Sequence, residues 1–66
     1  MRYRYTVRLI CGDEVRFESA DEPMEIMAMV GAKGEWFMVP GEDGRTEIIS
    51  KVQVQYISAE VIGENI

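Results

Sequence analysis

Residues 2–18 read RYRYTVRLICGDEVRFE, and apolar and polar side chains alternate on both sides of the Gly-Asp-Glu segment. Apolar residues occupy positions 3, 5, 7, 9 and 11, and then positions 15 and 17. A period of two, rich in aromatic and β-branched residues, is typical of a half-buried β-strand. The stretch therefore predicts a β-hairpin at the start of the fold.

The loop of this hairpin is predicted at residues 12–14, because that choice keeps apolar residues opposite apolar ones. The pairs it gives are Cys11 with Val15, Leu9 with Phe17, and Arg8 with Glu18. A loop at 11–13 would oppose two arginines, and like charges directly opposite each other are destabilising. This register places Cys11 in the core as a small hydrophobic residue, with a reactive thiol as the alternative.

After the hairpin the sequence predicts one short helix and three further strands. Pro23 is favourable in a first helical turn, acidic residues surround it, and Gly31 and Gly34 end the apolar run that begins at Met24. The strands are expected at residues 35–39, at 46–49 and from 52 onward. Beyond Tyr56 the apolar parity changes, which implies a bulge or a sharp bend.

The element order β-β-α-β-β-β indicates an α+β, mostly β fold in a single small domain of residues 1–66. We expect five short antiparallel strands in a strongly bent sheet or SH3-like barrel, with the helix between strands 2 and 3. A β-grasp is the alternative, although its helix usually runs longer. The residues expected in the core are Val7, Leu9, Val15, Phe17, Ile26, Val52 and Val54.

Composition narrows the chemistry that this domain can perform. The 66 residues carry a net charge of −5 and include one cysteine and no histidine. An internal disulfide, a histidine-based catalytic pair and a structural zinc site are therefore not expected, nor is any enzymatic activity, metal or cofactor. The acidic charge disfavours wholesale binding to nucleic acid or anionic lipid. It either meets a basic partner or keeps the protein soluble.

Hydropathy bears on the cellular location. No apolar run approaches the roughly 20 residues that a membrane span needs. The alternating N-terminus lacks the continuous apolar stretch of a signal peptide. With a lone cysteine, the cytoplasm is the expected compartment.

One face of the predicted hairpin carries four of the seven basic residues: Arg2, Arg4, Arg8 and Arg16. This arginine face is a candidate for binding nucleic acid or a small ligand. The interleaved Tyr3 and Tyr5 lie on the opposite face, so they cannot stack bases beside the arginines. Glu14 and Glu18 share the face and neutralise it in part. The expected state is therefore a solvated, ion-paired surface.

A second candidate surface is apolar and would bind protein. The predicted strand at 35–39 is apolar on both faces, and one short helix can cover only one of them. Methionines of the helix either fill the core or form an adaptable binding surface. Met27 is expected in the core, whereas for Met29 both positions are equally compatible with the sequence. The candidate partner-binding residues are Trp36, Phe37, Met38, Met29 and Met24. The sequence also predicts a two-fold dimer with Trp36 or Phe37 near its centre.

Two parts of the chain resemble a known group: the opening Tyr5-x-Val7-x-Leu9, Gly12 and Val15-x-Phe17, and the closing Ile48/Ile49, Val52, Val54 and Tyr56-Ile57. They resemble small uncharacterised proteins encoded by phages and prophages of Gram-positive bacteria. The closing stretch is also similar to the strand–corner–strand ending of SH3-like barrels, including the Sm-like proteins. The RNA-contacting motifs of Sm-like proteins are missing, so RNA binding is not implied. The phage resemblance implies a small regulator or inhibitor of a host protein.

Overall fold

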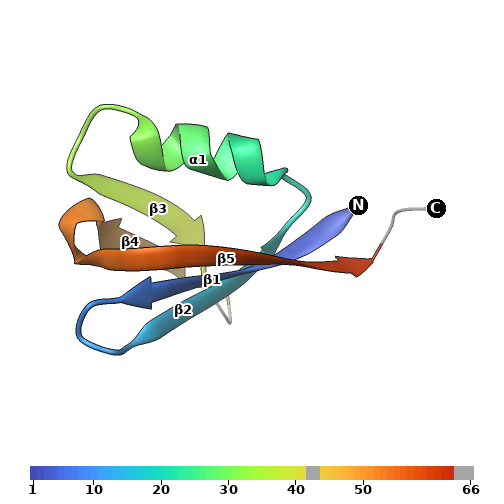
Figure 1. The fold of residues 1–66 in the computed structure, drawn as a ribbon, viewed down its shortest axis with the longest axis horizontal. Coiled ribbons are helices and arrows are strands. Elements are labelled where there is room, and N and C mark those ends of the chain that lie inside the picture. Colours follow the sequence, from blue (N-terminus) through green and yellow to red (C-terminus); the bar gives the residue numbers. More distant parts are fainter. Residues whose placement is uncertain (42–43, 64–66) are drawn as a thin grey trace.

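The computed structural model describes residues 1–41 and 44–63 and arranges them in two small antiparallel sheets and one α-helix (Figure 1). The elements are β1 (Arg2–Leu9), β2 (Glu14–Ser19), α1 (Pro23–Gly31), β3 (Trp36–Pro40), β4 (Thr46–Ser50), the 3-10 helix η2 (Lys51–Gln53) and β5 (Val54–Gly63). One sheet has the strand order β2-β1-β5, and the other consists of β3 and β4. The expected five antiparallel strands, with a helix between the second and third, are confirmed.

The two sheets are not closed into a barrel, so the SH3-like barrel predicted from the sequence is wrong in this respect. Closure would require both edges of one sheet to pair with the edges of the other, with β2 beside β3 and β5 beside β4. In the described residues β2 is hydrogen-bonded to β1 alone and β3 to β4 alone. In the chain, α1 connects β2 of the first sheet to β3 of the second. A β-grasp would gather the strands in a single sheet, so this division departs from that alternative as well.

The turn of the first hairpin differs from the predicted one. The Leu9 amide donates to the Asp13 carbonyl at 2.8 Å, and the Gly12 amide donates to the Leu9 carbonyl at 2.9 Å. The loop therefore spans residues 10–12, and Gly12 ends it with φ at 100°. A three-residue hairpin loop needs a left-handed residue at this position, and glycine adopts it without strain. Cys11, predicted to be buried, is exposed in this turn.

The register of the hairpin moves with its turn. Phe17 pairs with Tyr5, where the sequence predicted Leu9, and Arg8 pairs with Glu14. The predicted pairs are therefore wrong. Each residue of the second strand pairs with a β1 residue four positions earlier than predicted. Because side chains alternate with a period of two, an even shift leaves every side chain on its predicted face. The separation of an apolar and an arginine-bearing face is thus unaffected.

Helix α1 begins where the sequence places it. Pro23 occupies the first turn, and the Glu22 amide donates to the Glu25 carboxylate at 3.2 Å, as in a capping box. Of its residues only Ile26 is buried, while Met29 and Val30 pack partly against the core. Met27, expected in the core, is 73% exposed. A position one residue after Ile26 is turned by about 100° from the buried side of the helix.

The core lies between the two sheets and draws residues from both: Tyr5, Val7, Phe17, Ile26, Phe37, Val39 and Ile49. Val7, Phe17 and Ile26 were predicted. Leu9, Val15 and Val54 are partly buried against this cluster. Val52 is wrong as a core residue, since it is 77% exposed. It falls in η2 and not in a strand, so strand alternation does not apply to it.

Tyr5 anchors the start of α1 to the core. Its ring stacks on Phe17 with centroids 5.2 Å apart, and its hydroxyl donates to the Asp21 carbonyl at 2.6 Å. Burial raises the pKa of Tyr5 above its ordinary value, and Tyr3 and the carboxylates of Asp21, Glu25 and Glu22 raise it further. The neutral hydroxyl is therefore kept as a donor, which ties the residues before the helix to β1.

The irregularity expected near Tyr56 is confirmed as a register shift in β5. Arg8 pairs with Tyr56, whereas the next residue, Leu9, pairs with Val54. The extra residue in β5 lets both Val54 and Ile57 pack against the core, although they are three positions apart.

Candidate functional site

The outer face of the β3–β4 sheet is an apolar surface. Phe37, Val39 and Ile49 point into the core, so the alternate residues of both strands point outward. Among these, Trp36 is 60% exposed, Met38 62% and Ile48 61%. Met38 pairs directly with Ile48, and Trp36 lies two residues before Met38 on the same side of β3. These three side chains form one neighbouring group, called here the β3–β4 face.

The structure brings together only part of the predicted partner-binding set. Trp36 and Met38 share the β3–β4 face. Phe37 is 5% exposed and belongs to the core, so it is not available to a partner. Met29 packs partly against the core, and Met24, 80% exposed, lies on α1. The expectation that this strand is apolar on both faces is correct, and the core covers only one of them.

Ile48 was not among the predicted binding residues. The sequence holds two adjacent isoleucines, and one of them must face inward and the other outward. Their order depends on the pairing of Phe37 with Ile49, which the sequence does not reveal. The only available signal was that β4 shares the two-sided apolar character of β3.

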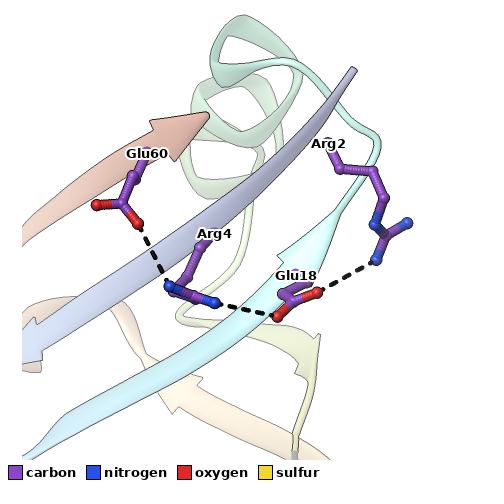
Figure 2. A network of polar contacts seen from close by, with 4 residues as sticks. All are labelled: Arg2, Arg4, Glu18 and Glu60. Carbon is purple, nitrogen blue, oxygen red and sulfur yellow. Dashed lines mark hydrogen bonds and ion pairs between the residues drawn. The ribbon is translucent and has the colours of Figure 1, made fainter. Parts of the chain in front are cut away.

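The arginine face is neutralised by ion pairs. Glu18 lies between Arg2 and Arg4 on this face (Figure 2). Its carboxylate is 3.8 Å from the Arg2 guanidinium and 3.6 Å from that of Arg4, and Arg4 also reaches Glu60 at 3.3 Å. Further along the hairpin, Glu14 accepts from Arg8 at 2.9 Å and from Arg16 at 3.0 Å. The predicted ion-paired surface is therefore present.

These ion pairs disfavour the binding of an anion to the arginine face. A depression of about 480 Å³ lies beside Arg4 and Arg16, but Glu18 also lines it. A phosphate entering there would have to compete with a carboxylate that already lies near Arg4. Attraction between a polyanion and four arginines is offset by three glutamates on the same surface.

We expect the double variant Arg2→Gln/Arg4→Gln to change the free energy of unfolding by no more than about 1 kcal/mol, because exposed ion pairs contribute about 0–1 kcal/mol. Chemical denaturation followed by circular dichroism measures this change. Binding of single-stranded DNA and RNA to the unmodified protein is measured in parallel at low and high salt. Tight binding that weakens steeply with salt and is lost in the variant would establish the arginine face as a nucleic-acid site.

Comparison of the chain with protein-family models, with curated proteins and with solved structures gives no match. Within residues 1–41 and 44–63, no helix is long and apolar enough to cross a membrane. In the same residues, no group of three or more acidic or cysteine side chains is arranged to hold a metal ion.

Proposed function

We propose that the protein is a non-enzymatic protein-binding module of the cytoplasm that docks a partner protein on the β3–β4 face. The observation that carries the proposal is the exposure of Trp36, Met38 and Ile48, each about 60%, side by side on a sheet whose inner face is already fully used by the core. Contiguous apolar groups of this kind mark interaction surfaces, and tryptophan is among the residues most enriched at binding hot spots.

The energetics favour occupation of this face. Burying the exposed part of each of the three side chains contributes on the order of 1–2 kcal/mol. Only another molecule can bury these three side chains, because the core of the domain already packs against the inner sides of β3 and β4 through Phe37, Val39 and Ile49. Small regulators that bind a host protein, which the resemblance to phage and prophage proteins implies, need a compact surface of this type and no catalytic group.

Trp36 is the only tryptophan of the chain and lies within the proposed site. It therefore reports on binding directly: covering its indole shifts the fluorescence to shorter wavelength and protects it from acrylamide. We expect proteins retained by the immobilised chain from a lysate of its host cells to be lost with the double variant Trp36→Ser/Met38→Ser. The retained protein, once purified, should shift the emission of Trp36 on titration.

Met24→Ser is the matched control, because Met24 is exposed but lies on α1. The control should retain the same protein as the unmodified chain. Retention that is equal in all three proteins, or binding that leaves the emission of Trp36 unchanged, would exclude the β3–β4 face as the docking site.

A further inference from the structure

Helix α1 is more apolar than its burial explains. Of its nine residues only Glu25 is charged, and only Ile26 is buried. Met24 is 80% exposed and Met27 is 73% exposed, so apolar side chains also lie on the outward side of the helix, next to the exposed Glu25. A helix with apolar residues on most of its circumference is normally covered on more than one side. In the structure, apolar side chains on one side of α1 are therefore exposed that would be expected to be buried.

Strand β5 shows a related anomaly along its free edge. It is ten residues long, carries Glu60 as its one charged residue, and is hydrogen-bonded to β1 alone among the described strands. Proteins usually protect an edge strand by making it short, by adding lysine or proline, or with a β-bulge. The opposite edge, β2, has three charged residues among its six. In β5 the register shifts opposite Arg8/Leu9 and Arg2/Tyr3 leave Tyr56–Val61 as a regular segment. This segment has neither lysine nor proline, and its outer edge offers unpaired backbone groups to another strand.

A groove joins these two features into one surface. It has a volume of about 400 Å³ and is lined mainly by apolar side chains of both elements: Pro23, Ile26, Met27 and Val30 from α1, and Ile57 and Ala59 from β5. Tyr5 of the core also lines it. The exposed side of α1 and the free edge of β5 are thus contiguous, and we call them together the α1–β5 face.

We propose that the α1–β5 face binds a second copy of the chain about a two-fold axis, with β5 of one copy paired antiparallel to β5 of the other. The three-stranded sheets then join into one six-stranded sheet. The axis stands perpendicular to this sheet, so the two α1 helices lie on the same side of it and run antiparallel. Met27 of each copy is covered by the partner, and the groove is filled.

The sequence of β5 suits pairing with itself. With the axis at Ser58, Ile57 lies opposite Ala59, and Glu60 lies opposite Tyr56. No two like charges face each other in this register, so the ladder is free of like-charge repulsion. A ten-residue strand is about 33 Å long, and the longest dimension of the molecule is 37 Å. Register shifts opposite Arg8/Leu9 and Arg2/Tyr3 leave Tyr56–Val61, about 20 Å, as the regular part of the β5 edge.

The charges at the two ends of α1 favour the same arrangement. Asp21, Glu22 and Glu25 lie at its start, whereas Lys33 follows its end and the Lys51 amine donates to the Ala32 carbonyl nearby. A two-fold axis that reverses the helix brings the acidic end of one copy toward the basic end of the other. This attraction offsets part of the repulsion between two chains of net charge −5.

The interface size is also attainable. A standard stable interface covers about 800 Å² per partner, and the isolated chain exposes 4881 Å². Covering about one sixth of the surface is within reach of a strand and a helix that both run along the long axis. The β3–β4 face consists of other elements and stays free for the partner proposed above. The two-fold dimer predicted from the sequence is thereby centred on β5 and not on Trp36.

The test compares two substitutions of the same kind at exposed methionines. Met27→Lys places a charge in the α1–β5 face, and Met38→Lys places one in the β3–β4 face. Sedimentation equilibrium at micromolar concentrations should show a dimer for the unmodified chain and for Met38→Lys. Met27→Lys should raise the dimer Kd by about a hundredfold or more, since each copy would bring an unpaired ammonium group into an apolar contact. Circular dichroism checks that both variants keep the native fold.

A second variant, Ala59→Lys, places a lysine in β5. Lysine protects the edge strands of natural proteins from pairing, so this variant should also be a monomer. A monomeric unmodified chain would overturn the proposal, as would a dimer that survives both Met27→Lys and Ala59→Lys. Dissociation by Met38→Lys would assign the interface to the β3–β4 face instead. Failure of the partner-binding experiment leaves the dimer result unaffected, because the two experiments use different faces.

Discussion

The substitution Phe17→Ala is expected to unfold the protein at 25 °C. Phe17 is 7% exposed and stacks on the fully buried Tyr5, so its removal leaves a cavity between β1, β2 and the residues that cover them. Truncating a buried phenylalanine costs about 3–5 kcal/mol, and the core of a domain of this size supplies about 3–5 kcal/mol in total. The two quantities are equal in size, so little or no stability remains in the monomer.

Thermal unfolding followed by circular dichroism measures this effect. Trp36→Ala is the aromatic control, because Trp36 is 60% exposed and its removal should change the free energy of unfolding by about 0.5 kcal/mol or less in the monomer. A cooperative transition of Phe17→Ala at nearly the temperature of the unmodified protein would show that Phe17 does not hold the two strands of the hairpin to the core.

The second large effect is expected at Ile49, where the chain supplies its own control in the preceding residue. Ile49 is 4% exposed and Ile48 is 61% exposed. Ile49→Ala should lower the free energy of unfolding by about 2–5 kcal/mol, whereas Ile48→Ala should change it by about 0.5 kcal/mol or less. The same substitution in the same strand thus separates the core from the β3–β4 face.

Chemical denaturation of both variants gives the comparison. The reverse order of effects would mean that β3 and β4 pair with a register shifted by one residue, since such a slip exchanges the two faces of a strand. It would also place Ile49 in the proposed binding surface and remove Ile48 from it. The experiment therefore tests the fold and the site together.

Several local features were correctly predicted because short-range chemistry decides them. Alternation places Val7 and Phe17 on the inner face of the hairpin, and proline with neighbouring acids begins a helix at Pro23. The change of apolar parity near Tyr56 predicted the irregularity of β5. Each of these features depends on residues that are close together in the sequence.

Predictions that depend on which residue of another strand a residue pairs with, or on where a strand ends, were less successful. The hairpin register was wrong by four residues, because Gly12 ends the loop in a left-handed conformation, whereas pair matching alone had placed it at the start. Cys11 and Val52 were expected in the core, but one lies in the turn and the other in η2. Alternation carries no information on where a strand stops.

The candidate site shows the same division. That β3 is apolar on both faces follows from the sequence Trp36-Phe37-Met38-Val39 itself. That Phe37 faces the core and Trp36 the outside, and that Ile48 joins Met38, follows only from the packing of two sheets that do not close into a barrel. The sequence by itself determined the order of the helix and the five strands and, within a strand, which side chains share a face, because those depend on local periodicity. Which of two apolar faces is buried was decided by the tertiary structure alone, because burial depends on contacts between residues far apart in the chain.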